Sequence, residues 1–128
     1  MRILGIGVDI VQNKRIRSLV NDKSFINRTF GKNEVKLSKK ISNKTNYFAK
    51  RFAAKESLVK SLGTGFRNNL NFKDIEVIND KIGKPFFLES KKVSDIIRKK
   101  FKVKKFYLFL SISDEKEYSV AFTILQVK

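Results

Sequence analysis

Apolar residues along the chain recur with two different periods, which separate expected strands from expected helices. Residues 3–8 are apolar and β-branched, and this pattern predicts a buried strand. Gly5 and Gly7 within it indicate a close approach of another backbone or a bend. Asp9 follows directly, so we expect its carboxylate at the end of this strand.

Residues 46–62 give the strongest helical signal of the chain, and Gly63 is placed to end that helix. Four apolar residues share one face of it at helical spacing: Phe48, Phe52, Val59 and Leu62. Shorter helices are expected at residues 14–20, 24–28 and 34–40, and an amphipathic one near residues 93–101.

The remaining segments alternate as strands do. Residues 74–79 predict a strand, and a turn at 83–85 leads into an apolar stretch. Residues 106–113 and 118–127 predict a β-hairpin that residues 114–117 connect. We therefore expect a single α+β domain over residues 1–128: a small antiparallel sheet with a long central helix and flanking helices.

The absence of His and Cys restricts the possible functions of the chain more than its net charge does. The net charge is +17, from 29 Lys and Arg against 12 Asp and Glu, and it favours an anionic partner: nucleic acid, an anionic membrane, a phosphate-rich cofactor or an acidic protein. The chain has no His and no Cys, so a metal would be held by carboxylate, carbonyl and water, which suit magnesium. The lack of Cys also suits the cytoplasm. No apolar run approaches the roughly 20 residues of a membrane span.

Two acids are candidate ligands, each with a plainer alternative. Asp9 could instead cap the helix that follows it. Glu56 is predicted on the apolar stripe of the long helix, where a carboxylate must be paired, bind a metal or lie at an interface. The plainer alternative is an ordinary ion pair with Lys60, four residues further on.

Other candidates carry weaker signals. Gly63-Thr64-Gly65 could expose backbone N–H groups to a phosphate, or could simply end the helix. Ser111 and Ser113 lie on one face of a predicted strand as structural residues or ligand contacts, and no His is present to activate them. Basic residues of the first predicted helix could receive an acidic partner or form a solvated face: Lys14, Arg15 and Arg17.

Four motifs in order resemble the bacterial holo-acyl-carrier-protein synthases. Gly5-Ile6-Gly7-Val8-Asp9-Ile10 resembles the opening of that family. Residues 52–60, FAAKESLVK, resemble the phosphopantetheinyl transferase signature Trp/Phe-x-x-Lys-Glu-x-x-x-Lys. Gly63-Thr64-Gly65-Phe66-Arg67 and Gly83-Lys84-Pro85 follow at the family's spacing, and the resemblance covers nearly the whole chain.

The resemblance implies the phosphopantetheinyl transferase fold and transfer of 4′-phosphopantetheine from coenzyme A to a serine of an acidic acyl carrier protein, in fatty acid biosynthesis. It implies Mg²⁺ held by Asp9 and Glu56, with Lys60 beside the reacting phosphate. It implies a homotrimer with active sites at subunit interfaces, and neither nucleic acid nor membrane as partner. The implied coenzyme contacts are Lys60, Gly63, Thr64, Gly65, Lys84, Pro85 and Ser111. The implied carrier-protein dock is Lys14, Arg15 and Arg17.

One departure leaves the general base open. Many synthases of this type carry a His in the penultimate strand, where this chain has Phe109. Glu56, a metal-bound water and Lys60 are alternatives for the base. Two other functions also stay open: a small RNA- or ribosome-binding protein, which the charge would suit, and a catalytically silent member of the same fold.

Overall fold

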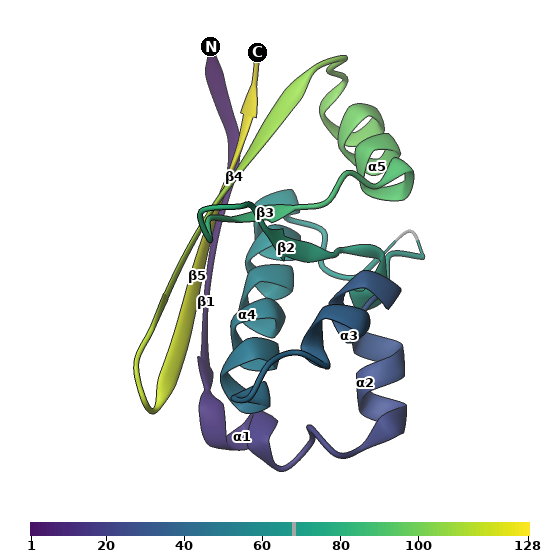
Figure 1. The fold of residues 1–128 in the computed structure, drawn as a ribbon. Coiled ribbons are helices and arrows are strands. Elements are labelled where there is room, and N and C mark those ends of the chain that lie inside the picture. Colours follow the sequence, from purple (N-terminus) through teal and green to yellow (C-terminus); the bar gives the residue numbers. More distant parts are fainter. Residues whose placement is uncertain (68) are drawn as a thin grey trace.

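A three-stranded antiparallel sheet with the order β1–β5–β4 carries the long helix α4 against one face (Figure 1). The structure is a computed structural model and describes residues 1–67 and 69–128. The strands and the central helix are β1 (Arg2–Gln12), β4 (Phe106–Asp114), β5 (Tyr118–Val127) and α4 (Lys44–Leu62). Both chain ends lie at the same end of the sheet (Figure 1). None of the described helices is long and apolar enough to cross a bilayer.

Strand β1 corrects the expectation that Asp9 ends a strand or caps a helix. The strand continues to Gln12, and Asp9 lies within it, paired with Ala121 of β5. Gln12, not Asp9, occupies the N-cap position of the next helix. The apolar run stops at Asp9, but the backbone ladder continues because strand pairing joins main-chain groups whatever the side chain.

Helix α4 packs directly on β1 because two glycines remove the intervening side chains. A Cβ at Gly5 would collide with the carbonyl oxygen of Ser61, and one at Gly7 with that of Ser57. The predicted close approach is thus confirmed. Gly63 ends the helix with φ of 76°, as its sequence position predicted.

The hairpin of β4 and β5 confirms the alternation seen in the sequence. Leu110 and its neighbours at every second position face α4, whereas Tyr107, Phe109 and Ser111 are exposed on the opposite face. Asp114 still pairs with Ser119, so the connection is shorter than residues 114–117.

The other helices lie on the same side of the sheet as α4, with α2 and α3 beside it, α1 at the bottom of the view and α5 at the upper right (Figure 1). They are α1 (Asn13–Arg17), α2 (Lys23–Thr29), α3 (Lys32–Ser38) and α5 (Lys91–Phe101). All four were expected, although α1 ends at Arg17 rather than at residue 20.

A second, two-stranded sheet pairs β2 (Val77–Asn79) with β3 (Pro85–Phe87). The predicted strand at residues 74–79 is shorter than expected: Asp74 ends a 3₁₀ turn that spans Phe72–Asp74, and the strand begins only at Val77. In that turn the Asp74 carboxylate accepts a hydrogen bond from the Asn71 N–H at 2.8 Å. The predicted turn at residues 83–85 is confirmed, and Gly83 supplies its positive φ of 90°.

Candidate active site

An open pocket of about 360 Å³ lies beside the C-terminal half of α4. Its lining residues are Glu56, Val59, Lys60, Gly63, Gly65 and Phe66. Glu56 and Lys60 are one helical turn apart and therefore project to the same side of α4. The two glycines belong to the segment that follows the helix, so the pocket brings together two motifs that the sequence singled out separately.

Asp9 joins this group from β1. Gly7 and Val11 on either side of it face α4, and by the two-residue period of a strand Asp9 faces α4 as well. Its Oδ1 accepts a hydrogen bond from Lys60 Nζ at 3.1 Å, and the same Nζ donates to the Val8 carbonyl at 3.0 Å. The expected ion pair of Lys60 with Glu56 is therefore replaced, among the described residues, by one with Asp9.

The position of Glu56 on α4 differs from the expectation. Phe48, Val59 and Leu62 are buried as predicted, but Glu56 is only partly buried. It lies between Phe52 and Lys60 on the least buried stripe of the helix, facing outward. Its carboxylate is thus available to a ligand.

The electrostatics of Glu56 show that the two acids influence each other. Partial burial raises the pKa of Glu56 above its ordinary value of 4.5, the negative charge of Asp9 raises it further, and the positive charge of Lys60 opposes both. A cation close to both carboxylates would relieve this repulsion. Among residues 1–67 and 69–128, no cluster of three or more His, Cys, Asp or Glu side chains could hold a metal ion. Two carboxylates nevertheless fit Mg²⁺, because that ion commonly takes one or two carboxylates together with phosphate oxygens.

Several expected coenzyme contacts do not line this pocket in one chain. Thr64, Lys84, Pro85 and Ser111 are not among its described lining residues. Ser111 is exposed on the face of the sheet opposite α4. Lys84 and Pro85 belong to the β2–β3 hairpin, where the backbone N–H of Lys84 donates to Asp80 at 2.8 Å. Phe109, at the position where the resemblance implied a His, is also on the exposed face and offers no proton acceptor.

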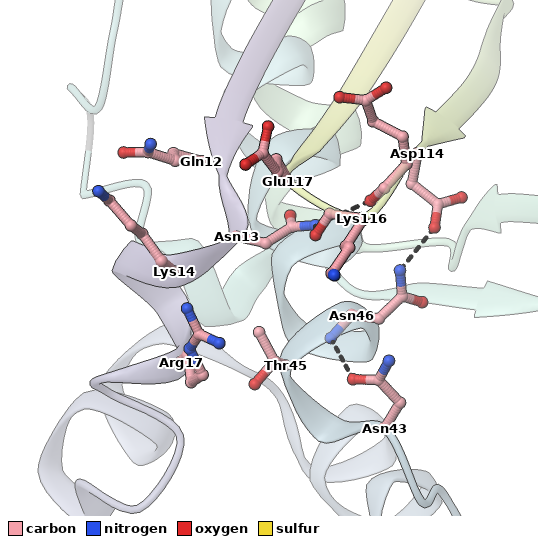
Figure 2. A pocket seen from close by; sticks show the side chains of 11 residues that line it. Gln12, Asn13, Lys14, Arg17, Asn43, Thr45, Asn46, Asp114, Lys116 and Glu117 are labelled. Atoms are coloured by element: carbon pink, nitrogen blue, oxygen red, sulfur yellow. Dashed lines mark hydrogen bonds between the residues drawn. The ribbon is translucent and has the colours of Figure 1, made fainter.

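The basic residues of α1 are all exposed, as a docking surface requires: Lys14, Arg15 and Arg17. Lys14 and Arg17 also line a polar cavity of about 600 Å³, whose other walls include Asp114 and Glu117 of the β4–β5 connection (Figure 2). Asn13 fixes the geometry by donating to the carbonyls of Glu115 and Lys116, both at 3.1 Å.

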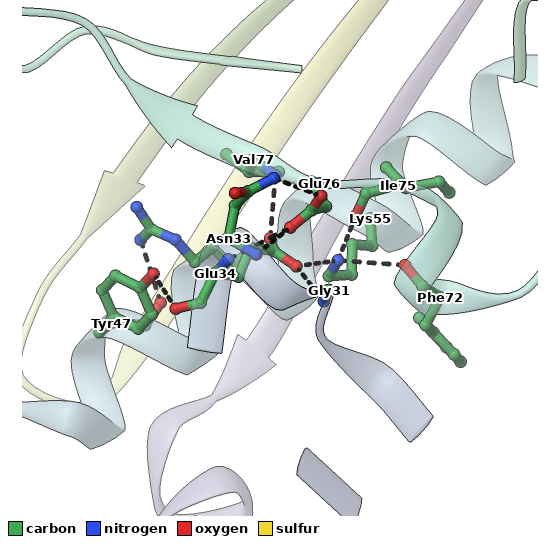
Figure 3. Close-up of polar contacts among 10 residues, drawn as sticks. Gly31, Asn33, Glu34, Tyr47, Lys55, Phe72, Ile75, Glu76 and Val77 are labelled. Carbon is green, nitrogen blue, oxygen red and sulfur yellow. Dashed lines mark hydrogen bonds and ion pairs between the residues drawn. The ribbon is translucent and has the colours of Figure 1, made fainter. Parts of the chain in front are cut away.

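Sequence reasoning missed a second charged group on α4. Lys55 points inward and pairs with Glu34 of α3 at 2.6 Å, with neither side chain exposed to solvent (Figure 3). Burial raises the pKa of Glu34 and lowers that of Lys55, while the opposite charge of each counteracts the shift. The sequence indicated Lys55 only as a residue of the signature, next to Glu56. Its pairing with Glu34 could not be predicted, because that residue is 21 positions away in the chain.

Comparison with known proteins identifies the family. The family model of the 4′-phosphopantetheinyl transferase superfamily matches residues 5–123. A relative from Pelagibacter ubique named holo-[acyl-carrier-protein] synthase is 59% identical over 128 residues, which cover 100% of both chains. The crystal structure of the Neisseria meningitidis synthase superposes with a TM-score of 0.87 at 35% identity, covering 98% of this chain and 99% of that one. That of a Bacillus anthracis synthase in complex with CoA (3′,5′-ADP) gives a TM-score of 0.80 at 37% identity, covering 98% of each. The chain therefore belongs to the holo-[acyl-carrier-protein] synthases of the 4′-phosphopantetheinyl transferase superfamily.

Proposed function

We propose that this enzyme transfers 4′-phosphopantetheine from coenzyme A to a serine of apo-acyl carrier protein and releases 3′,5′-ADP, in fatty acid biosynthesis. The observation that carries the proposal is the convergence of Asp9, Glu56 and Lys60 beside one open pocket. The relatives' name and the coenzyme A complex of the Bacillus anthracis protein support the same reaction. The lack of cysteine is compatible with the cytoplasm as its location.

The pocket beside α4 suits the diphosphate of coenzyme A. Lys60 lies at its edge with its side chain 54% exposed, so its ammonium can reach an anionic ligand. Gly65 leaves open space around its backbone, since a Cβ there would meet no atom within 4 Å. A phosphate can therefore approach the main chain closely at this turn.

Asp9 and Glu56 are the residues that would hold Mg²⁺. Both carboxylates face the same side of the β1–α4 junction, and neither is enclosed as Glu34 is. When bound, the ion would act as a Lewis acid on the diphosphate oxygens. Its two protein ligands would leave several coordination positions to phosphate and water, as is usual for magnesium.

The residues of the chain act chiefly by positioning and by charge. Lys60 is held in place by Asp9 and the Val8 carbonyl, so its positive charge is oriented before substrate arrives. A fixed cation stabilises the negative charge that develops on the leaving diphosphate oxygen. The serine hydroxyl of the carrier protein attacks the β-phosphorus, its proton passes to a base, and the bond to the 3′,5′-ADP oxygen breaks.

The uncovered face of the main sheet supports assembly into a homotrimer. Ile6, Val8 and Ile10 of β1 are 60%, 52% and 60% exposed, and Tyr107 and Phe109 extend the apolar surface onto β4. Such a surface is typical of a protein–protein interface. Neighbouring copies packed here would cover Phe109 and could bring Ser111, on the same face, to a neighbour's coenzyme. Light scattering should then give three chains per particle, and a monomer would contradict the proposal.

Helix α1 is the proposed dock for the acidic carrier protein. Neutralising Arg15→Gln and Arg17→Gln together should raise the KM for carrier protein by about tenfold at low salt, because charged contacts steer association, and should reduce its dependence on salt. A matched control removes the same charge from exposed residues elsewhere, Lys99→Gln and Lys104→Gln. Equal KM values for the two double variants at low salt would rule α1 out.

Mass spectrometry tests the reaction itself. The enzyme is mixed with apo-carrier protein, coenzyme A and Mg²⁺, with a parallel sample containing a chelator. We expect one added phosphopantetheine per carrier protein, released 3′,5′-ADP, and neither product in the chelated sample. Binding of coenzyme A without transfer would instead identify a catalytically silent member of the fold.

A further inference from the structure

The buried pair of Lys55 and Glu34 connects three separate parts of the chain. Besides its 2.6 Å contact with Glu34, Lys55 Nζ donates to the carbonyl of Phe72 at 3.1 Å and to that of Ile75. The Glu34 carboxylate accepts the N–H groups of Gly31 at 3.0 Å and of Val77 at 2.9 Å (Figure 3). One ion pair therefore ties α3 and the segment from Phe72 to Val77 to the middle of α4.

A second carboxylate strengthens the same junction. Glu76 accepts hydrogen bonds from the backbone N–H of Asn33 at 2.9 Å, from its side-chain amide at 3.0 Å, and from the N–H of Glu34 at 3.2 Å. The start of α3 is thus bonded to the segment around Val77 from both sides. Buried ion pairs often contribute little net stability compared with apolar packing. The pair of Lys55 and Glu34 is therefore better explained by the position in which it holds these segments.

An aromatic stack leads from this junction to the pocket. The Phe72 ring lies 5.3 Å from that of Phe52, nearly parallel to it, and 4.1 Å from that of Phe66. Phe66 lines the open pocket together with Glu56 and Lys60. Lys55 holds the backbone carbonyl of Phe72, and Phe72 in turn supports the Phe66 side chain.

Lys55 and Glu56 are neighbours on α4 and contribute to the same pocket in different ways. Consecutive helical residues point about 100° apart, so Lys55 faces the interior while Glu56 faces the pocket. We propose that Lys55 and Glu34 are positioning residues that hold the Phe72–Phe66 wall of the coenzyme A pocket. This inference rests on the proposed function, because it takes that pocket as the coenzyme site.

The test removes both charges at once. In Glu34→Leu with Lys55→Met neither member of the pair is left buried without the other, and such replacements are often tolerated by a fold. The exposed pair Lys91–Asp95, 2.9 Å apart, provides the matched control as Lys91→Gln with Asp95→Asn. We expect the KM for coenzyme A to rise by about 10- to 100-fold in the buried double variant. Loss of residues that support the ligands of a metal site lowers affinity or activity by a similar factor. The KM of this variant for carrier protein should stay unchanged. In the control variant, the KM for coenzyme A and the KM for carrier protein should both stay unchanged.

Amide hydrogen exchange at Arg67 and Ile75, whose N–H groups donate to the carbonyls of Gly65 and Phe72, separates this inference from the proposed function. Faster exchange with a higher KM for coenzyme A supports both. Faster exchange with an unchanged KM keeps the supporting role but overturns the assignment of this pocket to coenzyme A. Unchanged exchange and KM in a folded double variant overturn the positioning role.

A second variant covers the case in which the double variant does not fold. Phe72→Leu removes the ring between Phe52 and Phe66 but keeps the backbone carbonyl that Lys55 binds. Phe86→Leu, at the exposed residue of β3, serves as its control. Phe72→Leu should raise the KM for coenzyme A severalfold relative to Phe86→Leu, and equal values would overturn the inference.

Discussion

Helix α4 contributes to two charged clusters in opposite environments: Lys55 pairs with Glu34 of α3, and Lys60 pairs with Asp9 of β1. Lys55 and Glu34 face inward with 0% of either side chain exposed, and every oxygen of the Glu34 carboxylate has a donor. Lys60 reaches the surface with 54% of its side chain exposed and pairs with Asp9, which is 15% exposed at the junction of β1 and α4, with Glu56 beside them. The inward group has its hydrogen-bonding capacity used by the protein, whereas the outward carboxylates retain capacity for a ligand.

The buried charges therefore serve the fold, whereas the partly exposed charges are available for catalysis. A buried carboxylate with three donors is stable only while its partners stay in place, so it fixes the chain around it. Two partly exposed carboxylates that repel each other are better stabilised by a cation than by the fold alone. The difference predicts that losing an inward charge harms stability first, and that losing an outward one harms catalysis first.

The largest expected effect comes from breaking the inward pair on one side. Lys55→Met leaves the Glu34 carboxylate buried without its cation, which should lower the free energy of unfolding by about 3–5 kcal/mol. Urea unfolding measures this, with Lys91→Met at the surface as the control. A loss no greater than that of Lys91→Met would mean that the inward pair does not secure the fold.

The next effect comes from the outward acid. Glu56→Gln removes a proposed magnesium ligand and should lower the transfer rate by more than about 100-fold. Even mutation of a residue that only supports a metal ligand can lower activity by up to that factor. The free energy of unfolding should stay the same or rise, because the pKa of Glu56 is raised in the fold and its ionised form is disfavoured there. The exposed control Glu89→Gln should keep full activity. Full activity of Glu56→Gln would contradict the metal role.

The smallest effect is the titration of Glu56 itself. Its pKa, followed by ¹³C NMR without metal, should lie above the ordinary 4.5, because partial burial and the Asp9 charge both disfavour ionisation. Asp9→Asn removes the neighbouring negative charge and should lower the pKa. The stability contribution of Glu56 should correspondingly decrease as the pH rises through this pKa. No change of the pKa in Asp9→Asn would mean that the two carboxylates do not interact.

Sequence periodicity predicted the elements of the fold that local patterns determine. The alternation of β4 and the stop at Gly63 were predicted correctly because each depends on neighbouring residues. The end of β1 was misplaced at Asp9, because main-chain pairing with β5 continues past an acidic side chain. The start of β2 was likewise misplaced: it was predicted at Asp74, which ends a 3₁₀ turn, whereas the strand begins at Val77.

The candidate site was predicted in its residues but not in its contacts. Asp9 and Lys60 are 51 residues apart in the chain, and their ion pair depends on the glycines that let α4 approach β1. The helical spacing of Glu56 and Lys60 favoured an ion pair between them, but the nearer partner of Lys60 comes from another element. The pairing of Lys55 with Glu34 depends on tertiary packing, which periodicity does not describe.

Ion binding tests the central claim most directly. Mn²⁺, a hard cation that suits carboxylate ligands as Mg²⁺ does, can be titrated in the presence of coenzyme A and followed by electron paramagnetic resonance. We predict one bound ion per chain in the native protein and in Glu89→Gln, and strongly weakened binding in Asp9→Asn and Glu56→Gln. Binding in these two variants as tight as in the native protein would contradict the account.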